Sequence, residues 1–383
     1  MLTFNYKKWN IIGGWLCFLV ALITYTLTVE PTVSFWDPGE YIATSAKLQV
    51  GHPPGAPFYQ MLGALFSLFA ISPQHIALAV NMVAVFSSAF TILFMFWSMT
   101  NILKKIVTKT SEWNTSNAIA VLGSAAIGSL AFSFTDSFWF NAVESEVYAS
   151  AMVLTAILLY LGLRWVDDMD QPRGNRWLLL IGLVAGCSFG VHLMALLTIP
   201  SIGLLYFFKK YEKVTVKNFI IGNITAVAAL FFLFAFFFPK LLAFFGKTEI
   251  FAINTLGLPF NSGTILAFLL LIGVTVFGLY YTRKKGYAMI NTLILTLVFV
   301  CVGLTAWLML PIRANANVTI NENTPSDAAE LLAYYQREQY GDESIYYDSY
   351  FTKAYVGLDK NNPWKDDKPN YERDYKNREI CSS

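Results

Sequence analysis

The sequence predicts an all-α integral membrane protein with about nine spanning helices. Of its 383 residues, 56% are hydrophobic and only 14% are charged, whereas a soluble domain carries roughly 25% charged residues. Apolar stretches of about 20 residues recur along the chain, which is long enough to cross a hydrocarbon core of about 30 Å. The basic residues between these stretches are distributed very unevenly, as expected for a multi-span protein.

The predicted transmembrane domain covers residues 1–310. Only a break at Gly190 and His192 separates the fifth span from the sixth. If these two formed one long helix, every later loop would change side. The predicted spans are 11–29, 77–101, 117–135, 148–164, 177–191, 193–208, 218–238, 264–281 and 287–310.

Positive charge favours nine spans, with the N-terminus in the cytoplasm and the C-terminus in the periplasm. On this topology the outer loops before residue 311 contain only Lys47, Lys240 and Lys247. This asymmetry of basic residues disappears if the fifth and sixth spans merge. It also predicts a location in the cytoplasmic (inner) membrane. The fifteen basic residues of the cytoplasmic segments are Lys7, Lys8, Lys104, Lys105, Lys109, Arg164, Arg173, Arg176, Lys209, Lys210, Lys213, Lys217, Arg283, Lys284 and Lys285.

Two long segments lie on the outer side. The first outer loop, residues 30–76, contains an apolar stretch (58–71) that is too short to span, so we expect an interfacial or re-entrant helix. Residues 311–383 form a polar outer tail. Within it, Pro325-Ser326-Asp327 resembles a helix start, which predicts a helix over residues 327–340.

Several function classes are disfavoured. A net charge of +2 does not suggest nucleic acid, and the four cysteines form no metal-binding or disulfide pattern. No ionisable residue lies near the middle of a predicted span and no internal repeat is evident, which argues against an ion-coupled transporter. Candidate chemistry gathers in the outer loops, where all three histidines also lie.

The sharpest motif is Ser34–Tyr41, with the sequence SFWDPGEY. If a short helix begins at Pro38, Asp37 and Glu40 lie on one face of it. Aromatic neighbours at a membrane surface raise the pKa of a carboxylate, which suits a general base. A helix-capping acid within an aromatic belt explains the same pattern. The spacing does not choose between Asp37 and Glu40 as the base.

The segment Gly51–Pro57, GHPPGAP, forms a rigid turn. Its His52 is either a ligand of a phosphate or sugar, or part of a stiff entry to the next helix. In Asp136–Tyr148, acids mixed with Trp and Phe suit sugar recognition, although an interface belt fits equally. Glu144 and Tyr148 are four residues apart and would share a helix face, with Glu146 pointing elsewhere.

The ninth span reaches the outer surface at Leu310–Asn317, LPIRANAN. Arg313 matches the geometry of a lipid-linked phosphate, but an arginine at a membrane boundary also commonly snorkels. The predicted site comprises Asp37 and Glu40 as catalytic residues. The predicted substrate- and donor-binding residues are His52, Glu144, Glu146, Tyr148, His192, Arg313 and Asn315.

Four segments resemble a known family when taken together: TVEPTVSFWDPGEYIATSAKLQVGHPPGAPFY, FWFNAVESEVYA, FGVHLMALLTIP and PIRANANVTINENTPSDAAELLAYYQREQYGD. The family consists of multi-span membrane proteins, common in Bacteroidetes, long catalogued as a domain of unknown function. A vertebrate relative is a transmembrane protein O-mannosyltransferase. The family is placed in the glycosyltransferase-C superfamily, whose members use polyprenyl-phosphate sugars. The resemblance covers about Tyr6 to Asp342.

The resemblance implies a glycosyltransferase-C-like fold and a transfer outside the cytoplasmic membrane. Asp37 matches the first-loop acid that acts as base or acceptor anchor, and Glu40 is the second acid of that motif. Glu144 or Glu146 matches the acid often found in the second outer loop. Arg313 lies where late-helix basic residues meet the donor phosphate. Many family members continue past this point, so we expect a short form, a fragment of a longer protein or a truncated gene product.

The expected reaction transfers a sugar, with mannose as the first candidate, from a polyprenyl phosphate to Ser or Thr of exported proteins. The expected partners are the bilayer, the lipid-linked sugar and the acceptor protein. No cofactor is expected; Asp37, Glu40 and Glu144 are the acids that would hold a divalent metal if one were used. The rival functions are a transporter or flippase of lipid-linked intermediates and a non-catalytic assembly subunit.

Overall fold

The computed structural model describes residues 4–341, 371–374 and 379–382. The chain forms two compact units, Met1–Tyr340 and Gly341–Ser383. The first unit extends past the predicted domain end at residue 310. In the second, strands β1 (Tyr371–Asp374) and β2 (Glu379–Ser382) pair antiparallel. Most of the predicted tail beyond residue 341 lies outside the described residues.

The first unit is all-helical, as predicted, and the described residues include eight helices long and apolar enough to cross a membrane. The fifth predicted span, 177–191, is the shorter helix α8 (Arg176–Phe189). The eight are α1 (Tyr6–Thr28), Pro73–Thr110 with α4 (Ile76–Thr110), α5 (Thr115–Ser133), α7 (Val147–Asp168), Leu193–Lys210 with α9 (Thr198–Lys210), Val216–Asn254, α12 (Ser262–Lys284) and Ala288–Asn315 with α13 (Ala288–Leu304).

The spanning helices expose apolar side chains that a soluble protein would bury. On α12, Val274 is 70% exposed, Phe277 66% and Val276 60%. Contiguous apolar surface of this extent requires an apolar environment. The described chain is therefore a multi-span membrane protein whose outer helices face lipid.

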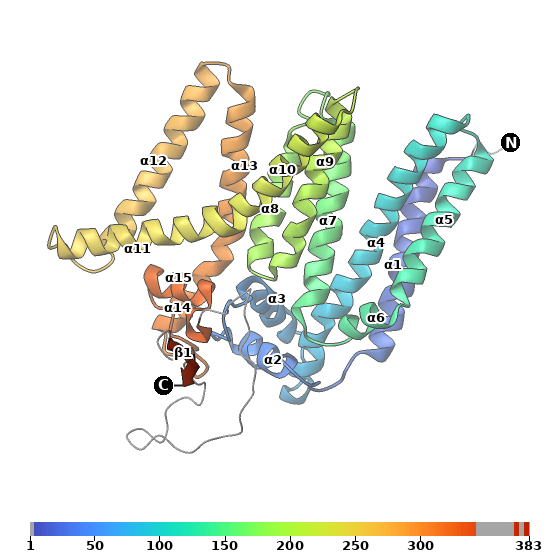
Figure 1. The fold of residues 1–383 in the computed structure, drawn as a ribbon. Helices are drawn as coiled ribbons and strands as arrows, with labels where there is room; N and C mark the ends of the chain where they lie inside the picture. The colour runs from blue at the N-terminus through green and yellow to red at the C-terminus, as the bar shows by residue number, and fades with distance from the viewer. Residues whose placement is uncertain (1–3, 342–370, 375–378, 383) are drawn as a thin grey trace. The chain divides into compact units, whose positions relative to one another are not determined.

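The helix over residues 216–254 changes direction partway. It consists of α10 (Val216–Phe231), a π-helical segment (Phe232–Phe237) and α11 (Phe238–Asn254). A π-helical segment followed by Pro239 is a recognised cause of a helix bend. Figure 1 shows α11 lying across the direction of α12 and α13. The seventh predicted span, 218–238, thus ends where α11 begins.

Helices α8 and α13 pack with their backbones in contact. Gly182 and Gly186 follow a G-x-x-x-G spacing on α8; Gly182 lies against Thr296 of α13, and Gly186 against Gly303. A Cβ on Gly186 would overlap the carbonyl oxygen of Val300, and one on Gly303 would lie 2.5 Å from the carbonyl oxygen of Leu183. Small residues of this kind allow close helix approach in membranes.

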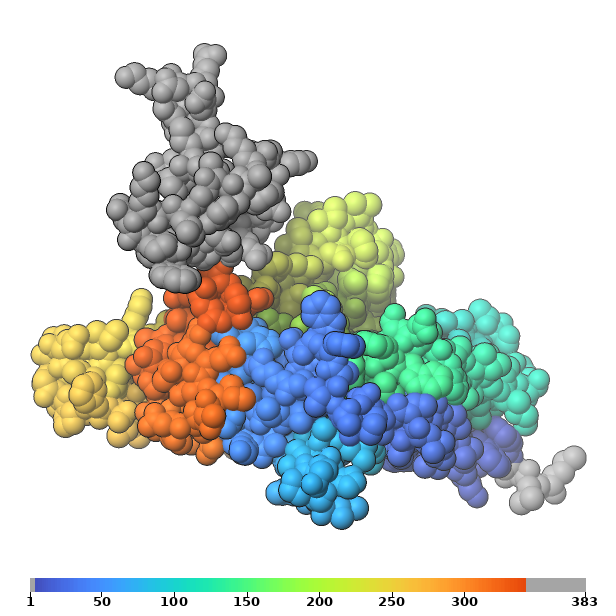
Figure 2. All heavy atoms as spheres, turned by 90° about the horizontal axis from the view of Figure 1, so that it is seen from below, coloured from blue at the N-terminus to red at the C-terminus, as the bar shows by residue number. Residues whose placement is uncertain are grey.

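Short helices gather at one end of the first unit (Figure 1). They are α2 (Pro38–Lys47), α3 (Pro57–Ser67), α6 (Asp136–Ala142), α14 (Met309–Asn315) and α15 (Ala328–Gln336). Seen from below, the first loop occupies the middle of this end, with the segment after residue 300 on one side and the second outer loop on the other (Figure 2). The helices predicted to begin at Pro38 and near residue 327 are α2 and α15.

We predict that Gly186→Leu destabilises the protein by about 1–3 kcal/mol, because a side chain must separate two helix backbones. Thermal unfolding in detergent should show a lower Tm. The matched control is Gly273→Leu on α12, where an added Cβ meets no atom within 4 Å. An equal Tm for both variants would contradict the close α8–α13 contact.

Candidate active site

Asn81, a buried residue near the start of α4, joins the two outer loops. Its amide nitrogen donates to the carbonyl oxygens of Glu30 (2.7 Å) and Thr32 (3.0 Å). Its amide oxygen accepts from the Ser145 hydroxyl at 2.6 Å. The Glu30 amide also donates to the carbonyl oxygen of Val143 at 2.9 Å. The acids of the two loops are thereby brought to the same end of the molecule.

Asp37 occupies the N-cap position of α2 without capping it. Its side chain is 54% exposed and makes no capping hydrogen bond. The preceding Phe35 and Trp36 are 88% and 92% exposed, and Trp36 has a positive φ of 68°. Asp37 is thus the N-cap residue that the alternative interpretation expected, but its side chain does not cap the helix; the exposed aromatic neighbours are as predicted. Asp37 is left open to solvent or a ligand.

Glu40 and His52 form a tight pair across the first loop. Glu40 Oε1 accepts from the His52 amide at 2.6 Å, and Oε2 lies 2.8 Å from His52 Nδ1. The pairing with Glu40 raises the pKa of His52 although burial opposes it, and the charges of Asp37 and Glu322 add to the rise. Burial would raise the pKa of Glu40, but the bonds from His52 lower it overall. Both groups therefore favour their charged forms.

The other ring nitrogen of His52 faces Asp37, with Nε2 and Oδ2 4.0 Å apart. This separation is too long for a direct hydrogen bond. A hydroxyl group between the two atoms can accept from Nε2 and donate to Oδ2. The geometry thus distinguishes the two acids of the motif: Glu40 holds His52, and Asp37 is available to a ligand.

The turn that carries His52 is held in place by a residue that lies far along the chain. The hydroxyl of Tyr334 in α15, which is fully buried, donates to the carbonyl oxygen of Gly51 at 2.6 Å. Gly51 is required because a Cβ there would overlap Glu40 Oε1. Gly55 has a φ of 77°, and its Cβ would lie 2.8 Å from the Tyr334 ring. The glycines of the predicted rigid turn therefore serve close contacts.

The second outer loop contributes Glu146. It is only 8% exposed and lies at the N-cap position of α7. Burial, followed by the negative charge of Asp37, raises the pKa of Glu146 to about 7. Because α7 begins at Val147, Glu144 lies before the helix and does not share a helix face with Tyr148, contrary to prediction. Glu146, predicted to point elsewhere, is the acid that interacts with Asp37.

Sequence reasoning did not single out Asn81, Tyr334 or Glu322. The Glu322 amide donates to the carbonyl oxygen of Val50, two residues before His52, at 3.1 Å. Burial, and then the charge of Glu40, raise the pKa of the Glu322 carboxyl. Asn81 could have been identified from the sequence, because it is a polar residue inside an apolar span. Nothing local in the sequence indicates that Tyr334 and Glu322 reach the first loop.

Three predicted residues have other partners. The His192 ring lies 5.3 Å from that of Tyr148, and its Nδ1 accepts from the Met194 amide at 3.1 Å. Burial lowers the pKa of His192. Asn315 donates to the carbonyl oxygens of Pro311 and Ser326, which joins α14 to the loop before α15.

Arg313 donates from Nε to the carbonyl oxygen of Leu48 (2.5 Å) and from Nη2 to that of Lys47 (3.1 Å). These are the last carbonyls of α2, whose ten residues rise about 15 Å from the end near Asp37. The structure therefore places Asp37 and Arg313 at opposite ends of one helix. Within the described ranges, no group of three or more His, Cys, Asp or Glu side chains is arranged to hold a metal ion.

The fold and the site together define a multi-span membrane protein with a cluster of carboxylates and one charged histidine at one end of its helices. Residues 37–215 match the family model described as the Protein O-mannosyl-transferase TMEM260 N-terminal domain. The chain is also similar to the Protein O-mannosyl-transferase tmem260 of Dictyostelium discoideum, with 28% identity over 204 residues. That alignment covers 51% of this chain and 23% of the relative. No solved structure matches the chain.

The family match begins at Asp37 and includes Glu40, His52, Glu144, Glu146, Tyr148 and His192. Asn81, which joins the two loops, also lies within it, whereas Arg313, Glu322 and Tyr334 follow it. The aligned part spans about a quarter of the length of the relative. These two matches support the predicted relationship to the family as a distant one.

We predict that Glu40→Gln lowers the pKa of His52, because the variant removes the carboxylate that stabilises the imidazolium. Histidine side-chain NMR titration of protein labelled at its three histidines measures this directly. The other two histidine titrations should not move. An unchanged His52 titration would contradict the Glu40–His52 pair.

We predict that Asp37→Asn lowers the pKa of Glu146 from about 7 toward its ordinary value, without reaching it because burial persists. Infrared difference spectra against pH follow the protonated carboxyl band, and Glu146→Gln identifies that band by removing it. If the band titrates at the same pH with and without Asp37, the two loops do not share an electrostatic site.

Proposed function

We propose that this chain is a membrane glycosyltransferase that moves a sugar from a polyprenyl phosphate to a hydroxyl group of an exported protein. The observation that carries the proposal is the pairing of Asp37 Oδ2 with His52 Nε2 across 4.0 Å at an exposed site. A Ser or Thr hydroxyl between these atoms would be oriented by His52 and deprotonated by Asp37. The likeness to O-mannosyl-transferases supports mannose as the sugar and protein as the acceptor.

The chemistry needs one base and one positive charge. The acceptor oxygen attacks the anomeric carbon as Asp37 takes its proton, and the bond from that carbon to the phosphate oxygen breaks with inversion. The polyprenyl phosphate leaves with the electron pair. The imidazolium of His52 offsets negative charge in a site that otherwise contains Glu40, Glu146 and Glu322.

Glu146 is a second titratable carboxyl in the proposed site. Its pKa near 7 is raised partly by the charge of Asp37, so uptake of the acceptor proton by Asp37 makes Glu146 more acidic. Pairs of carboxyls whose environments separate their pKa values are typical of acid–base sites. Glu146 thus responds to the protonation of Asp37 from a buried position.

The remaining predicted ligands take supporting roles. Arg313 anchors the C-terminal end of α2 through its bonds to the carbonyl oxygens of Lys47 and Leu48. Tyr148 and His192, whose rings are 5.3 Å apart, and Glu144 are assigned to substrate binding. The outer (periplasmic) side of the inner membrane is the proposed location, on the distribution of basic residues.

We predict that Asp37→Asn lowers sugar transfer by roughly 10²- to 10⁴-fold, the usual contribution of a general base. Purified protein in detergent is supplied with radiolabelled polyprenyl-phosphate mannose and a periplasmic extract, and label entering protein is counted. Asp136→Asn, an exposed acid of the second outer loop, is the matched control and should retain activity.

Equal labelling by the wild type and Asp37→Asn would refute Asp37 as the base. Absence of label from the wild type, while a longer relative labels the same extract, would refute transfer by this chain alone and favour an assembly subunit. Movement of the intact lipid-linked sugar across vesicles, without labelled protein, would instead support the flippase alternative.

A further inference from the structure

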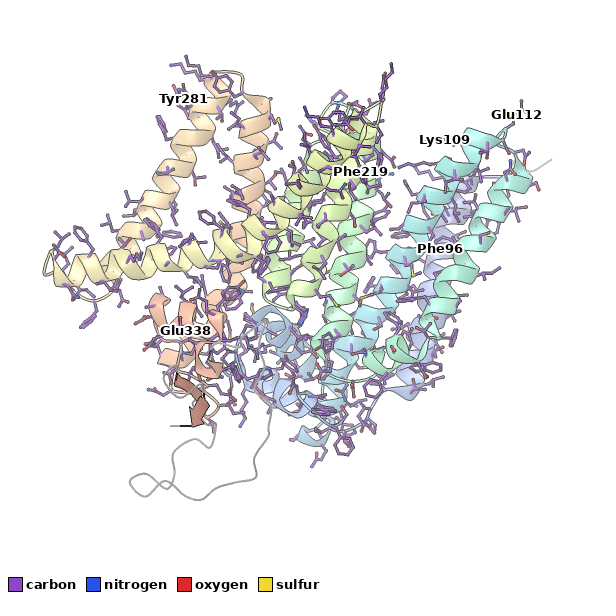
Figure 3. The ribbon with its side chains drawn as sticks, in the orientation of Figure 1. Phe96, Lys109, Glu112, Phe219, Tyr281 and Glu338 are labelled. Atoms are coloured by element: carbon purple, nitrogen blue, oxygen red, sulfur yellow. The ribbon has the colours of Figure 1, made fainter. Side chains whose placement is uncertain are left out.

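A second polar pocket lies at the opposite ends of the helices from the candidate active site. It is bounded by the start of α1, the later part of α4 and the later part of α7, and its volume is about 160 Å³. Figure 3 marks this end of α4 by Lys109, with Phe96 partway along the helix. The lining residues are Tyr6, Asn10, Trp97, Thr100, Asn101, Lys104, Tyr160 and Arg164.

Two hydrogen-bond acceptors in this pocket lack a partner. The side-chain oxygens of Asn10 and Asn101 are both buried, and neither accepts a hydrogen bond from the described residues. The orientation of Asn101 is fixed because its nitrogen donates to Asp167 Oδ2 at 2.7 Å. A buried polar atom without a partner is costly, so these two oxygens indicate a ligand with donor groups.

The same pocket presents positive charge. The Lys104 ammonium lies over the rings of Tyr6 (5.0 Å) and Trp113 (5.3 Å). Arg164 lies 3.7 Å from Asp168 and stacks over Trp177. Both cations sit on aromatic rings that orient them, and Arg and Lys at such positions bind phosphate.

The volume is large enough for a headgroup. A single water requires roughly 10–15 Å³ of such space, so the pocket holds the equivalent of about ten waters. Lys105 beside the pocket is paired with Asp167 at 2.6 Å, so Lys104 and Arg164 are the lining cations that attract an anionic lipid. A phosphate combined with hydroxyl donors satisfies both the cations and the two asparagine oxygens.

We infer that this pocket binds the headgroup of an anionic phospholipid that carries free hydroxyls, of the phosphatidylglycerol type. The phosphate lies at Lys104 and Arg164, and the glycerol hydroxyls donate to Asn10 and Asn101. The lipid belongs to the leaflet opposite the candidate active site. The inference does not depend on the proposed transferase activity.

Native mass spectrometry of the purified full chain in detergent, titrated with defined lipids, tests the inference. Phosphatidylglycerol should bind at least tenfold more tightly than phosphatidylcholine, which has the phosphate but no donor and no net charge. It should also exceed phosphatidic acid, which is anionic but lacks the glycerol hydroxyls. Equal binding of all three would overturn the inference.

The sharpest variant is Asn10→Leu, because the Asn10 side chain makes no hydrogen bond with the described residues. Trp97 Nε1 donates to the backbone carbonyl oxygen of Asn10 at 3.2 Å, and the substitution keeps that carbonyl. We expect a roughly three- to tenfold loss of phosphatidylglycerol affinity with an unchanged Tm, and a similar loss for Lys104→Gln. Lys109→Gln, an exposed basic residue on the same helix but outside the pocket, should bind as wild type. If Asn10→Leu binds as wild type while Lys104→Gln and Lys109→Gln weaken equally, only general charge attraction operates and the site does not exist.

Discussion

The candidate site depends on one side-chain amide. Asn81 uses both its donor and acceptor groups to hold the start of the first outer loop against the second. Its burial within a membrane-spanning helix makes these bonds costly to lose, because buried polar groups would be left without partners. Together with the bond from the Glu30 amide to the Val143 carbonyl oxygen, it joins the loops that carry Asp37 and Glu146. The charge of Asp37 then adds to the effect of burial in raising the pKa of Glu146.

The cluster is an unbalanced set of charges. Four carboxyls, Asp37, Glu40, Glu146 and Glu322, lie around a single imidazole. Glu40 is committed to that imidazole through both oxygens, whereas burial drives Glu146 and Glu322 toward their protonated forms. Of these four carboxyls, only Asp37 is both exposed and close to the second ring nitrogen of His52. This reduction of negative charge would favour binding of the phosphate donor that we propose.

The sequence was sufficient for the fold class because span length, apolar content and basic-residue asymmetry are local properties. It also predicted the short helix at Pro38, since a proline at the first helical turn after an acid is a local signal. Whether Asp37 or Glu40 is the base could not be predicted, because the answer depends on His52 folding back over α2. The pairing of Glu144 with Tyr148 failed for a similar reason: α7 begins three residues later than the spacing assumed.

Contacts between distant segments were equally inaccessible. Arg313 at the end of the last span was read as a phosphate ligand or a snorkelling residue, but it donates to carbonyls some 265 positions earlier in the chain. The bend after α10 depends on a π-helical segment that hydropathy does not reveal. Periodicity did not connect the four outer segments; the resemblance to a family did. The structure places three of these segments around His52.

The glycine contact between α8 and α13 has a mechanical consequence. Because backbone meets backbone there, the spacing of the two helices is not adjustable by side-chain rotamers. The helical run from α13 continues through a 3-10 segment (Thr305–Leu308) into α14, which ends at Asn315. Arg313 near the end of α14 donates to the carbonyl oxygens of Lys47 and Leu48 at the end of α2. The part of a change in the tilt of α13, for example in a thinner bilayer, that the 3-10 segment does not absorb would reach the helix that begins beside Asp37. The thickness of the membrane is thereby mechanically connected to the candidate site.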